Sequence, residues 1–253
     1  MSRTPRKINA VRNTCRIIEV LQEHGSAGIT EISESLNFSK SAVHGHLATL
    51  EEEGLVVKED HSYSLSLRFL DIAEQVKDGV ADHTIVKEEV TNLAEETGEV
   101  VHFGTEEEGR VVYLSKARGA SAVETASKIG KRMPMHSTSL GKALLAELSP
   151  ERCEQIVDRH GLPEQTAKTI TNTERLKSEL EETRQRGYSI DDEENIPGVR
   201  CIGMAVSVPE ANVLGALSIS GPSQRMTDER METELSEQIA QAANVIEVNS
   251  RYS

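Results

Sequence analysis

Apolar and polar positions in the first 54 residues recur at helical spacing in three separate runs. The first run predicts a helix that ends at His24-Gly25, and the third predicts a helix that Ser39 caps and Gly54 terminates. A short helix capped by Thr30 is expected between them. The side chains expected to face the core are Ile8, Val11, Cys15, Ile18 and Leu21 in the first run, Ile29, Ile32 and Leu36 in the second, and Val43, Leu47 and Leu50 in the third.

Two β-prone pieces follow the third helix, at residues 55–57 and 63–65, and the polar stretch between them predicts a small hairpin. Three helices and a hairpin, or wing, are the plan of a winged helix-turn-helix domain, which we expect over residues 5–66. Apolar residues at helical spacing then predict a linker helix, for which we expect residues 67–82.

The rest of the chain, residues 83–253, alternates runs of helical spacing with short β-prone runs. This order predicts an α+β domain with a largely antiparallel sheet, including a hairpin turn at residues 209–212. The first expected helix ends at Gly98, the others cover residues 139–148, 151–160, 173–186 and 227–248, and the strands cover residues 100–104, 110–115, 188–190, 201–208 and 213–220.

Charge is distributed unevenly along the chain. Residues 1–50 carry six basic and four acidic side chains, whereas the remaining 203 residues carry 22 basic and 38 acidic ones. Only the N-terminal end is therefore suited to approach a polyanion such as DNA. The acidic excess of the body, together with 17 Arg against 11 Lys, predicts a protein of a halophilic archaeon that works in a salt-rich cytoplasm. The alternative is an acidic protein of a mesophile.

The composition also excludes several classes of protein. No apolar run reaches the 18 or so residues that a membrane span needs, so no membrane partner is expected. The basic start of the chain runs into polar sequence, which predicts no secretion signal. Cys15, Cys153 and Cys201 are odd in number and far apart, which argues against disulfides and a CxxC metal site and favours the reducing cytoplasm.

The third predicted helix has the features of a recognition helix. With its apolar side chains inward, its outer face is small and polar, as entry into a major groove about 12 Å wide requires. The hairpin after it would add phosphate contacts beside the groove. The alternative is a helical hairpin with a solvated face. The expected groove-facing residues are Lys40, Ser41, His44 and Gly45, and the expected phosphate contacts are Arg12 and Arg16 in the first helix and Lys58 and Ser62 in the hairpin.

Four sequence blocks carry a family resemblance. They are VHGHLATLEEEGL at residues 43–55, RMPMHSTSLGKALLA at 132–146, GYSIDDEENIPGVRCIG at 187–203 and GALSISGP at 215–222. In this order they resemble the signatures of the IclR family of transcription regulators, and they span nearly the whole chain. The resemblance implies a winged helix-turn-helix, a linker helix that helps to pair protomers, and a C-terminal GAF-like domain that binds a small effector. It also implies homodimers or homotetramers on palindromic double-stranded operator DNA, without a cofactor and without catalysis.

The resemblance further implies an effector pocket. In relatives that sense small carboxylates, the pocket is lined by the loop before the Gly-Lys motif, the first acid of the Asp-Asp-Glu-Glu stretch, the cysteine ten residues later and two serines of the Ser-Ile-Ser strand. Glyoxylate-sensing relatives have Gly-Ala where this chain has Ser139-Leu140, and the larger side chain at position 140 changes the pocket volume. The residues carried over to this chain are Ser139, Leu140, Asp191, Cys201, Ser218 and Ser220.

These residue types also suit an acidic ligand on chemical grounds. Ser218 and Ser220 are two apart on a predicted strand, so both hydroxyls face one side and can donate to a ligand oxygen. Backbone N–H groups at the start of the 139–148 helix favour an anion. Asp191 would accept from a ligand hydroxyl, so we expect a small organic or sugar acid as the effector. The alternative for Asp191 is an ordinary solvated acidic turn.

The alternative function is a small-molecule enzyme built on the GAF-like domain, with the winged helix used for protein contacts. Cys201 with His136 or His102 is a conceivable nucleophile and base, yet no activating Cys-His spacing is present and the cysteine lies in an apolar strand. Only His44 and His46 are close together among the N-terminal histidines, and on a helix they face different ways. The sequence therefore predicts neither catalysis nor a metal site.

Overall fold

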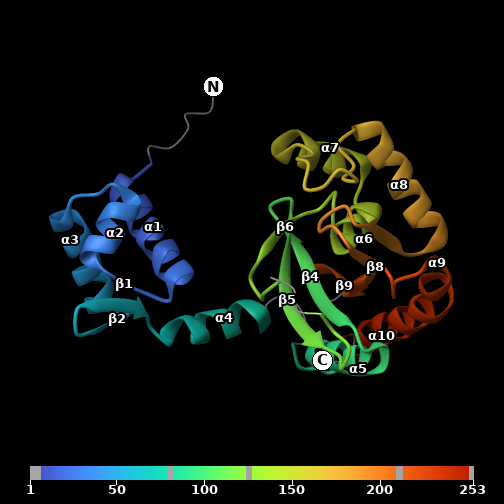
Figure 1. The fold of residues 1–253 in the computed structure, drawn as a ribbon, viewed down its shortest axis with the longest axis horizontal. Coiled ribbons are helices and arrows are strands. Elements are labelled where there is room, and N and C mark those ends of the chain that lie inside the picture. Colours follow the sequence, from blue (N-terminus) through green and yellow to red (C-terminus); the bar gives the residue numbers. More distant parts are fainter. Residues whose placement is uncertain (1–6, 79–82, 124–126, 209–212, 251–253) are drawn as a thin grey trace. The chain divides into compact units, whose positions relative to one another are not determined.

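The computed structural model describes residues 7–78, 83–123, 127–208 and 213–250 (Figure 1). Its internal contacts divide the chain into two compact units, with the boundary between Val76 and Lys77. This boundary falls inside the segment that we expected to be the linker helix. Parts of the expected domains and the expected hairpin turn lie outside the described residues, namely residues 5, 6, 79–82, 124–126, 209–212 and 251–253.

The N-terminal unit has the expected winged helix-turn-helix plan with one additional strand. The three strands form an antiparallel sheet in the order β1-β3-β2, so the hairpin is widened by a short strand that precedes the second helix. The elements are α1 (Asn9–His24), β1 (Ser26–Gly28), α2 (Ile29–Leu36), α3 (Lys40–Glu52), β2 (Val56–Glu59) and β3 (Ser62–Leu65), followed by α4 (Arg68–Asp78).

The buried face of α1 agrees with the expected one at Leu21, which is buried, and at Ile18, which packs against the core, but differs from it toward the start of the helix. Ile8 and Val11 are 67% and 58% exposed and Cys15 is exposed, whereas Ile17 and Val20 are buried. Both sets obey helical spacing, because α1 carries two neighbouring apolar stripes. The stripe that packs is the one that reaches α2, α3 and β3, and the other one remains open to solvent.

The start of α2 also differs from expectation, while the start of α3 agrees with it. β1 continues to Gly28, so α2 begins directly after it and Thr30 lies inside its first turn. The Gly28 N–H donates to the carboxylate of Glu31 at 2.6 Å, which replaces the expected cap. At α3, the Ser39 hydroxyl accepts from the Ala42 N–H at 3.2 Å, so this cap is confirmed.

The C-terminal unit is built on a six-stranded antiparallel sheet in the order β6-β5-β4-β9-β8-β7. The expected α+β fold is confirmed. The strands are β4 (Val100–Glu107), β5 (Arg110–Arg118), β6 (Arg132–Pro134), β7 (Ser189–Asp192), β8 (Val199–Val208) and β9 (Val213–Pro222). The helices are α5 (His83–Thr97), α6 (Ser139–Glu147), α7 (Pro150–His160), α8 (Thr173–Arg186), and a last helical stretch of α9 (Asp228–Arg230), the π-helical turn η2 (Met231–Leu235) and α10 (Ser236–Asn249).

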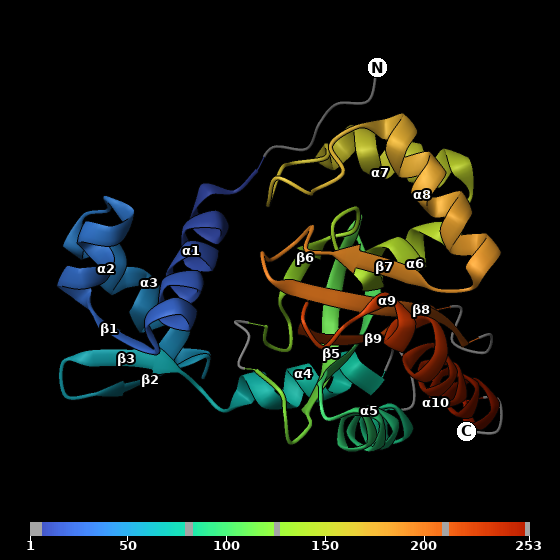
Figure 2. The same ribbon diagram turned by 45° about the vertical axis from the view of Figure 1, so that its right-hand side comes forward.

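The two faces of this sheet are chemically different. Helices α5 and α10 cover one face, and α6, α7 and α8 lie on the other (Figures 1 and 2). Ile202, Ile219 and Val101 are paired across three strands and belong to the apolar core under α5 and α10. Because side chains alternate along a strand, the neighbouring residues point to the side of α6. That side receives Cys201 and Ser220.

Candidate functional site

Helix α3 presents the expected polar face to solvent. Val43 and Leu47 are completely buried in the core of the N-terminal unit. His46 is half-buried, and its Nδ1 lies 2.9 Å from the hydroxyl of Thr14 on α1, so this histidine faces the neighbouring helix. The four residues expected to face the groove are all exposed: Lys40, Ser41, His44 and Gly45.

The residues expected to contact phosphate are also exposed. They are Arg12, Arg16, Lys58 and Ser62. The guanidinium carbon of Arg16 lies 5.0 Å from the ring centroid of Phe38, and the amino group of Lys58 lies 5.6 Å from that of Tyr63. An aromatic ring under each cation restricts its side chain and leaves its charge at the surface. The N-terminal unit therefore offers polar and cationic groups on α1, α3 and the wing.

A small cavity lies in the C-terminal unit, between the sheet and the first turn of α6. Its free volume is about 50 Å³. All of the residues carried over from the family resemblance line this cavity: Ser139, Leu140, Asp191, Cys201, Ser218 and Ser220. Sequence reasoning did not place further lining residues there, among them His102, Tyr113, Ser127, Lys131 and Asn195.

Strand register explains how distant residues converge on this cavity. Asp191 on β7 pairs with Cys201 on β8, and Cys201 pairs with Ser220 on β9. One step along the strands, Ser218 on β9 pairs with His102 on β4. Directly paired residues of antiparallel strands project to the same side, and so do residues two apart. The sheet thus sets five polar side chains on the face that α6 covers.

The first turn of α6 closes the cavity from the other side. Thr138 caps this helix, and its hydroxyl accepts from the Gly141 N–H at 3.2 Å. The N–H groups of Ser139 and Leu140 have no bonded partner among the described residues, as the first turn of a helix allows. A Cβ at Gly203 would lie 2.7 Å from the backbone of Ser139, so only glycine allows α6 to approach β8 this closely.

Asp191 is buried, with 2% of its surface exposed. Its Oδ1 accepts from the N–H groups of Glu194 at 2.7 Å and Asn195 at 3.3 Å, and its Oδ2 lies 3.8 Å from the thiol of Cys201. Burial raises the pKa of Asp191 to about 7, although the positive charge of Lys142 lowers it. Near neutral pH, this carboxyl is therefore able to donate as well as accept a hydrogen bond.

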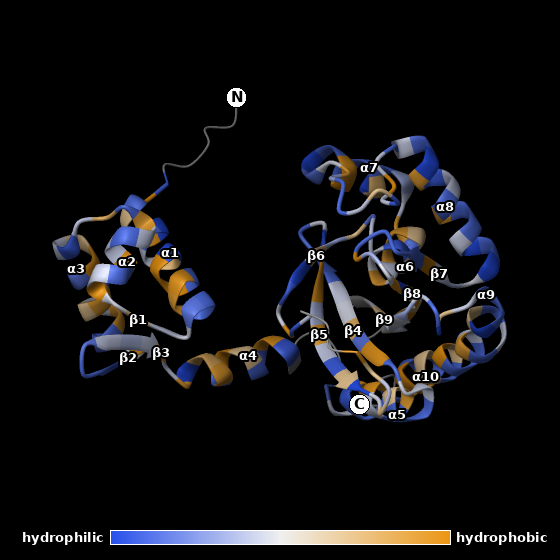
Figure 3. Cartoon of the chain, viewed as in Figure 1, coloured by the Kyte–Doolittle hydropathy of each residue, from blue (hydrophilic) through white to orange (hydrophobic). Residues whose placement is uncertain are grey.

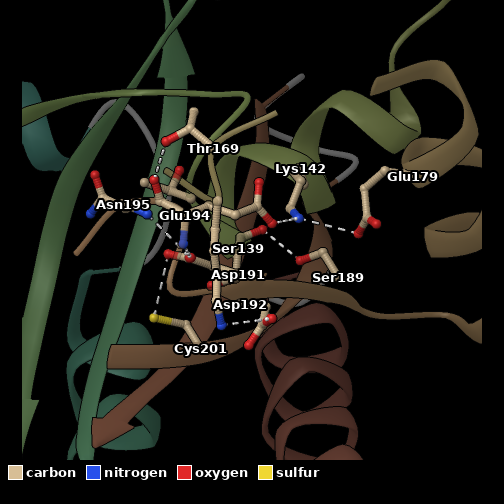
Figure 4. Close-up of polar contacts among 12 residues, drawn as sticks. Ser139, Lys142, Thr169, Glu179, Ser189, Asp191, Asp192, Glu194, Asn195 and Cys201 are labelled. Carbon is tan, nitrogen blue, oxygen red and sulfur yellow. Dashed lines mark hydrogen bonds and ion pairs between the residues drawn. The ribbon is translucent and has the colours of Figure 1, made fainter. Parts of the chain in front are cut away.

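The acidic stretch that begins at Asp191 is not a solvated turn. Glu194 is only 5% exposed, and its carboxylate pairs with the ammonium of Lys142 (Figure 4). Asp192 and Glu193 lie nearer the surface, where both pair with Lys168. The solvated alternative is therefore wrong for Asp191 and Glu194, because the turn folds inward against α6.

Two family models match the chain. The model described as the IclR helix-turn-helix domain matches residues 10–60, and the model described as the bacterial transcriptional regulator IclR C-terminal domain matches residues 81–248. The chain belongs to the IclR family of transcriptional regulators. It is a ligand-responsive regulator that binds DNA through its helix-turn-helix domain and an effector through its C-terminal domain.

The chain is similar to known proteins over nearly its whole length and theirs. The HTH-type transcriptional regulator KdgR of Escherichia coli is 34% identical over 237 residues, which cover 92% of this chain and 89% of that protein. The probable HTH-type transcriptional regulator ArcR of Halobacterium salinarum is 29% identical over 248 residues, covering 96% and 94%. The crystal structure of the Thermotoga maritima IclR superposes with a TM-score of 0.81 at 28% identity, covering 96% of this chain and 99% of that one.

His102 is a lining residue of this IclR-family pocket that the sequence did not single out as a binding residue. Its ring stacks on Tyr113 with centroids 4.6 Å apart, and its Nε2 lies 2.8 Å from the hydroxyl of Ser127. Burial, together with the charge of Lys116, lowers the pKa of His102 to about 3, so the ring is neutral at physiological pH. Its pairing with Ser218 on the neighbouring strand identifies His102 as a pocket residue. This pairing can be recognised only once the order of the strands in the sheet is known.

Membership of this family of regulators excludes the alternative of an enzyme. The surroundings of Cys201 agree with this conclusion. Burial raises the pKa of its thiol, and the neighbouring Asp191 raises it further, which is the reverse of what a nucleophile needs. His136 is instead bonded to the carbonyl of Pro163 at 3.1 Å.

Within residues 7–78, 83–123, 127–208 and 213–250, no group of three or more His, Cys, Asp or Glu side chains is arranged to hold a metal ion. In the same residues, no helix combines the length and apolar character that crossing a membrane requires.

Proposed function

We propose that the effector of this regulator is a small organic or sugar acid that binds in the α6 cavity. The observation that carries the proposal is the convergence, in one buried space, of hydrogen-bond donors for a carboxylate with a carboxyl group at the other end. Ser218, Ser220 and the N–H groups at the start of α6 would hold the ligand carboxylate. Asp191 would bind a hydroxyl, a hydrate or a protonated group of the ligand.

The dimensions of the cavity favour a small ligand. Its free volume is only about 50 Å³. Leu140 is 1% exposed and occupies part of the same space. A short hydroxy or keto acid fits this space with less rearrangement than a bulky aromatic acid does.

For the DNA-binding domain, we propose that α3 enters the major groove and that α1 and the wing contact phosphates. The support is the exposure of the polar α3 face together with the cations on α1 and the wing. The base-reading residues would be Lys40, Ser41, His44 and Gly45, and the phosphate contacts Arg12, Arg16, Lys58 and Ser62.

We also propose that the chain acts as a homodimer or homotetramer on a palindromic operator, in the cytoplasm. The support for an oligomer is the exposed apolar surface on α1 and around α4, which Figure 3 shows as hydrophobic segments along both helices. Apolar surface of this kind is typical of a protein interface. The residues are Ile8 at 67%, Val11 at 58%, Leu67 at 81%, Leu70 at 62% and Val76 at 60% exposure.

The proposal that the protein works in a salt-rich cytoplasm rests on the acidic excess of its body, since the whole chain has 42 acidic against 28 basic side chains. Molar KCl screens the repulsion among these charges. The secondary structure should therefore persist in molar KCl and decrease at low salt, as circular dichroism would measure. Equal stability in both conditions contradicts this proposal.

The test of the effector proposal is a thermal-shift screen with sugar acids, short keto acids and short hydroxy acids. A ligand that binds only the folded protein raises its unfolding temperature. At least one of these acids should stabilise the wild type, and Asp191→Ala and Ser220→Ala should lose this stabilisation. Ser115→Ala is the matched control, because Ser115 is buried in the same sheet but pairs with Phe103 of the α5-facing core. An unchanged midpoint with every acid, or an equal response in all variants, contradicts the proposal.

A further inference from the structure

Lys142 is the most deeply buried charged side chain near the effector cavity. It stands in α6, directly after Gly141, and has an exposed fraction of 0%. Its ammonium lies 2.5 Å from the carboxylate of Glu194 and 3.2 Å from that of Glu179 on α8 (Figure 4). Glu179 in turn pairs with Arg186 at 2.9 Å. One buried cation therefore connects α6, the 191–195 turn and α8.

Glu194 links this cation to the effector pocket through its backbone. Its side chain pairs with Lys142, while its N–H donates to Asp191 at 2.7 Å. Its carbonyl oxygen accepts from the hydroxyl of Thr169 at 2.6 Å. Glu194 is therefore held through its side chain, its N–H and its carbonyl oxygen at once, so the ion pair with Lys142 helps to fix the N–H that holds Asp191.

Helix α6 itself has little freedom to move. A Cβ at Gly141 would lie 2.2 Å from the carbonyl oxygen of Met135, and a Cβ at Gly203 would lie 2.7 Å from the backbone of Ser139. The hydroxyl of Ser189 on β7 also donates to the carbonyl of Ser139 at 2.6 Å. The helix turn that lines the cavity and the helix turn that carries Lys142 thus form one rigid support.

We propose that Lys142 is the positioning residue of the effector pocket, because its buried ammonium fixes Glu194 and thereby holds the carboxyl of Asp191 opposite the first turn of α6. This inference rests on the proposed function, since it assigns Asp191 to ligand binding. Burying the charged pair of Lys142 and Glu194 costs several kcal/mol of desolvation, and well-packed apolar side chains would stabilise the fold at least as well. The buried charges are explained instead by their effect on the pocket, because they fix the distance between Asp191 and the first turn of α6.

Titratable groups face Asp191 from every element around it. Those that interact with it electrostatically are Glu194 on its own turn, Lys142 on α6, Cys201 on β8 and Tyr113 on β5. His102 on β4 and Lys131 before β6 line the same cavity. Burial raises the pKa of Asp191 most, Lys142 lowers it and the charge of Glu194 raises it. Lys142 and Glu194 therefore shift the pKa of Asp191 in opposite directions through their charges.

The test is the titration of the Asp191 carboxyl carbon by NMR in the full-length protein without any ligand, with Asp191→Asn to assign the signal. Lys142→Met should raise the midpoint, because it removes both a positive charge near Asp191 and the group that fixes the Glu194 N–H on its carboxyl. Hydrogen exchange of the residue-194 amide, followed in the same samples, should become faster in Lys142→Met and in Glu194→Gln, since both break the ion pair that fixes this turn. Lys142→Arg, which keeps the charge, should bring the midpoint back toward that of the wild type. Lys177→Met is the matched control, because Lys177 also pairs with two glutamates but lies on the exposed side of α8. It should leave the midpoint unchanged.

An unchanged midpoint in Lys142→Met, or a residue-194 amide that exchanges as slowly in Lys142→Met and Glu194→Gln as in the wild type, overturns the inference. If Lys142→Met does not fold, Glu194→Gln decides, since it keeps a hydrogen-bonding group at its position. Unchanged exchange of the residue-194 amide in Glu194→Gln then overturns it. The titration uses no effector, so its failure is distinct from a failure of the proposed function, which the thermal-shift screen reports.

Discussion

The two units of the molecule place their functional groups in opposite environments. Among residues 7–76, no polar or charged side chain is buried, and the candidate DNA contacts stand on the surface. The C-terminal unit buries His102, Lys142, Asp191 and Glu194 around a small cavity. Exposed groups cost nothing in desolvation and recognise a partner by surface contact, whereas buried groups must be held by the fold. Mutations of the candidate contacts in the N-terminal unit should therefore change DNA binding without changing the unfolding free energy. Mutations around the cavity of the C-terminal unit should change both effector binding and the unfolding free energy.

The largest effect is expected at Lys142. Lys142→Met leaves Glu194 and Glu179 without their shared cation, and breaking a buried ion pair on one side costs about 3–5 kcal/mol. Chemical denaturation of wild type and variant measures this loss. Lys177→Met, which removes exposed ion pairs, should leave the unfolding free energy nearly unchanged. Equal losses in the two variants would mean that burial does not distinguish these lysines.

The second effect is a pH dependence caused by Asp191. Its pKa is about 7 in the folded protein against an ordinary value of 3.8, so the folded protein holds a proton that the unfolded chain releases. The unfolding free energy should therefore fall as the pH rises from about 4 to about 7. Asp191→Asn should remove this contribution, on the order of 3 kcal/mol over that range, when denaturation curves are compared at several pH values.

His102 provides the control for this prediction, because its contribution has the opposite sign. Its pKa is about 3 against an ordinary value of 6.5, so the unfolded chain binds a proton that the folded protein does not. This makes the folded state more stable as the pH rises through that window. In His102→Gln, the unfolding free energy should therefore fall more steeply with rising pH than in the wild type, whereas Asp191→Asn removes this fall. Parallel pH profiles for wild type and Asp191→Asn would show that Asp191 is not protonated in the folded protein.

In the N-terminal unit, His44→Ala should relax discrimination at one base position by about 1–3 kcal/mol. Because His44 is exposed on α3, the variant should unfold at the same temperature as the wild type. Competition binding with operator variants that each differ at one base pair measures the effect. Unchanged discrimination at every position would remove His44 from the recognition surface.

The smallest effect is expected at Lys40. Lys40→Ala should weaken binding to all DNA sequences alike and reduce the slope of log affinity against log salt by about 1. Titrations at several salt concentrations with operator and unrelated DNA test this. A loss confined to the operator would assign Lys40 to base reading, and an unchanged slope would show that it contacts no phosphate.

The sequence predicted more of the N-terminal unit than of the effector pocket. The inward and outward positions of α3 follow from helical spacing, and the structure confirms them at Val43 and Leu47. On α1 the same spacing was right at Leu21 and wrong at Ile8, Val11 and Cys15, because two apolar stripes run side by side and only packing selects between them. Strands as short as β1 and β6, with three residues each, are too short for a periodic signal.

The pocket depends on strand pairings that the spacing of apolar and polar residues in the sequence does not predict. Asp191 is one of four consecutive acids, and only the register of β7 with β8 and the buried Lys142 show that it points inward. His102 reaches the same cavity from 89 residues earlier in the chain, through the pairing of β4 with β9. The family resemblance supplied six of the lining residues, whereas His102, Tyr113 and the Lys142 network required the structure.

The proposed division of work, with the effector bound at Asp191 and the operator bound by the N-terminal unit, is tested most directly by a titration of the operator. Wild type and Asp191→Ala are compared with and without the acid that stabilises the wild type. Without the acid, both proteins should bind the operator equally, because Asp191 lies in the C-terminal unit and the DNA contacts lie on α1, α3 and the wing. With the acid, the wild-type affinity should change, and that of Asp191→Ala should change far less, since the variant loses about 1–3 kcal/mol of effector affinity. A wild-type response in Asp191→Ala, or a loss of operator binding in the absence of the acid, would contradict the account.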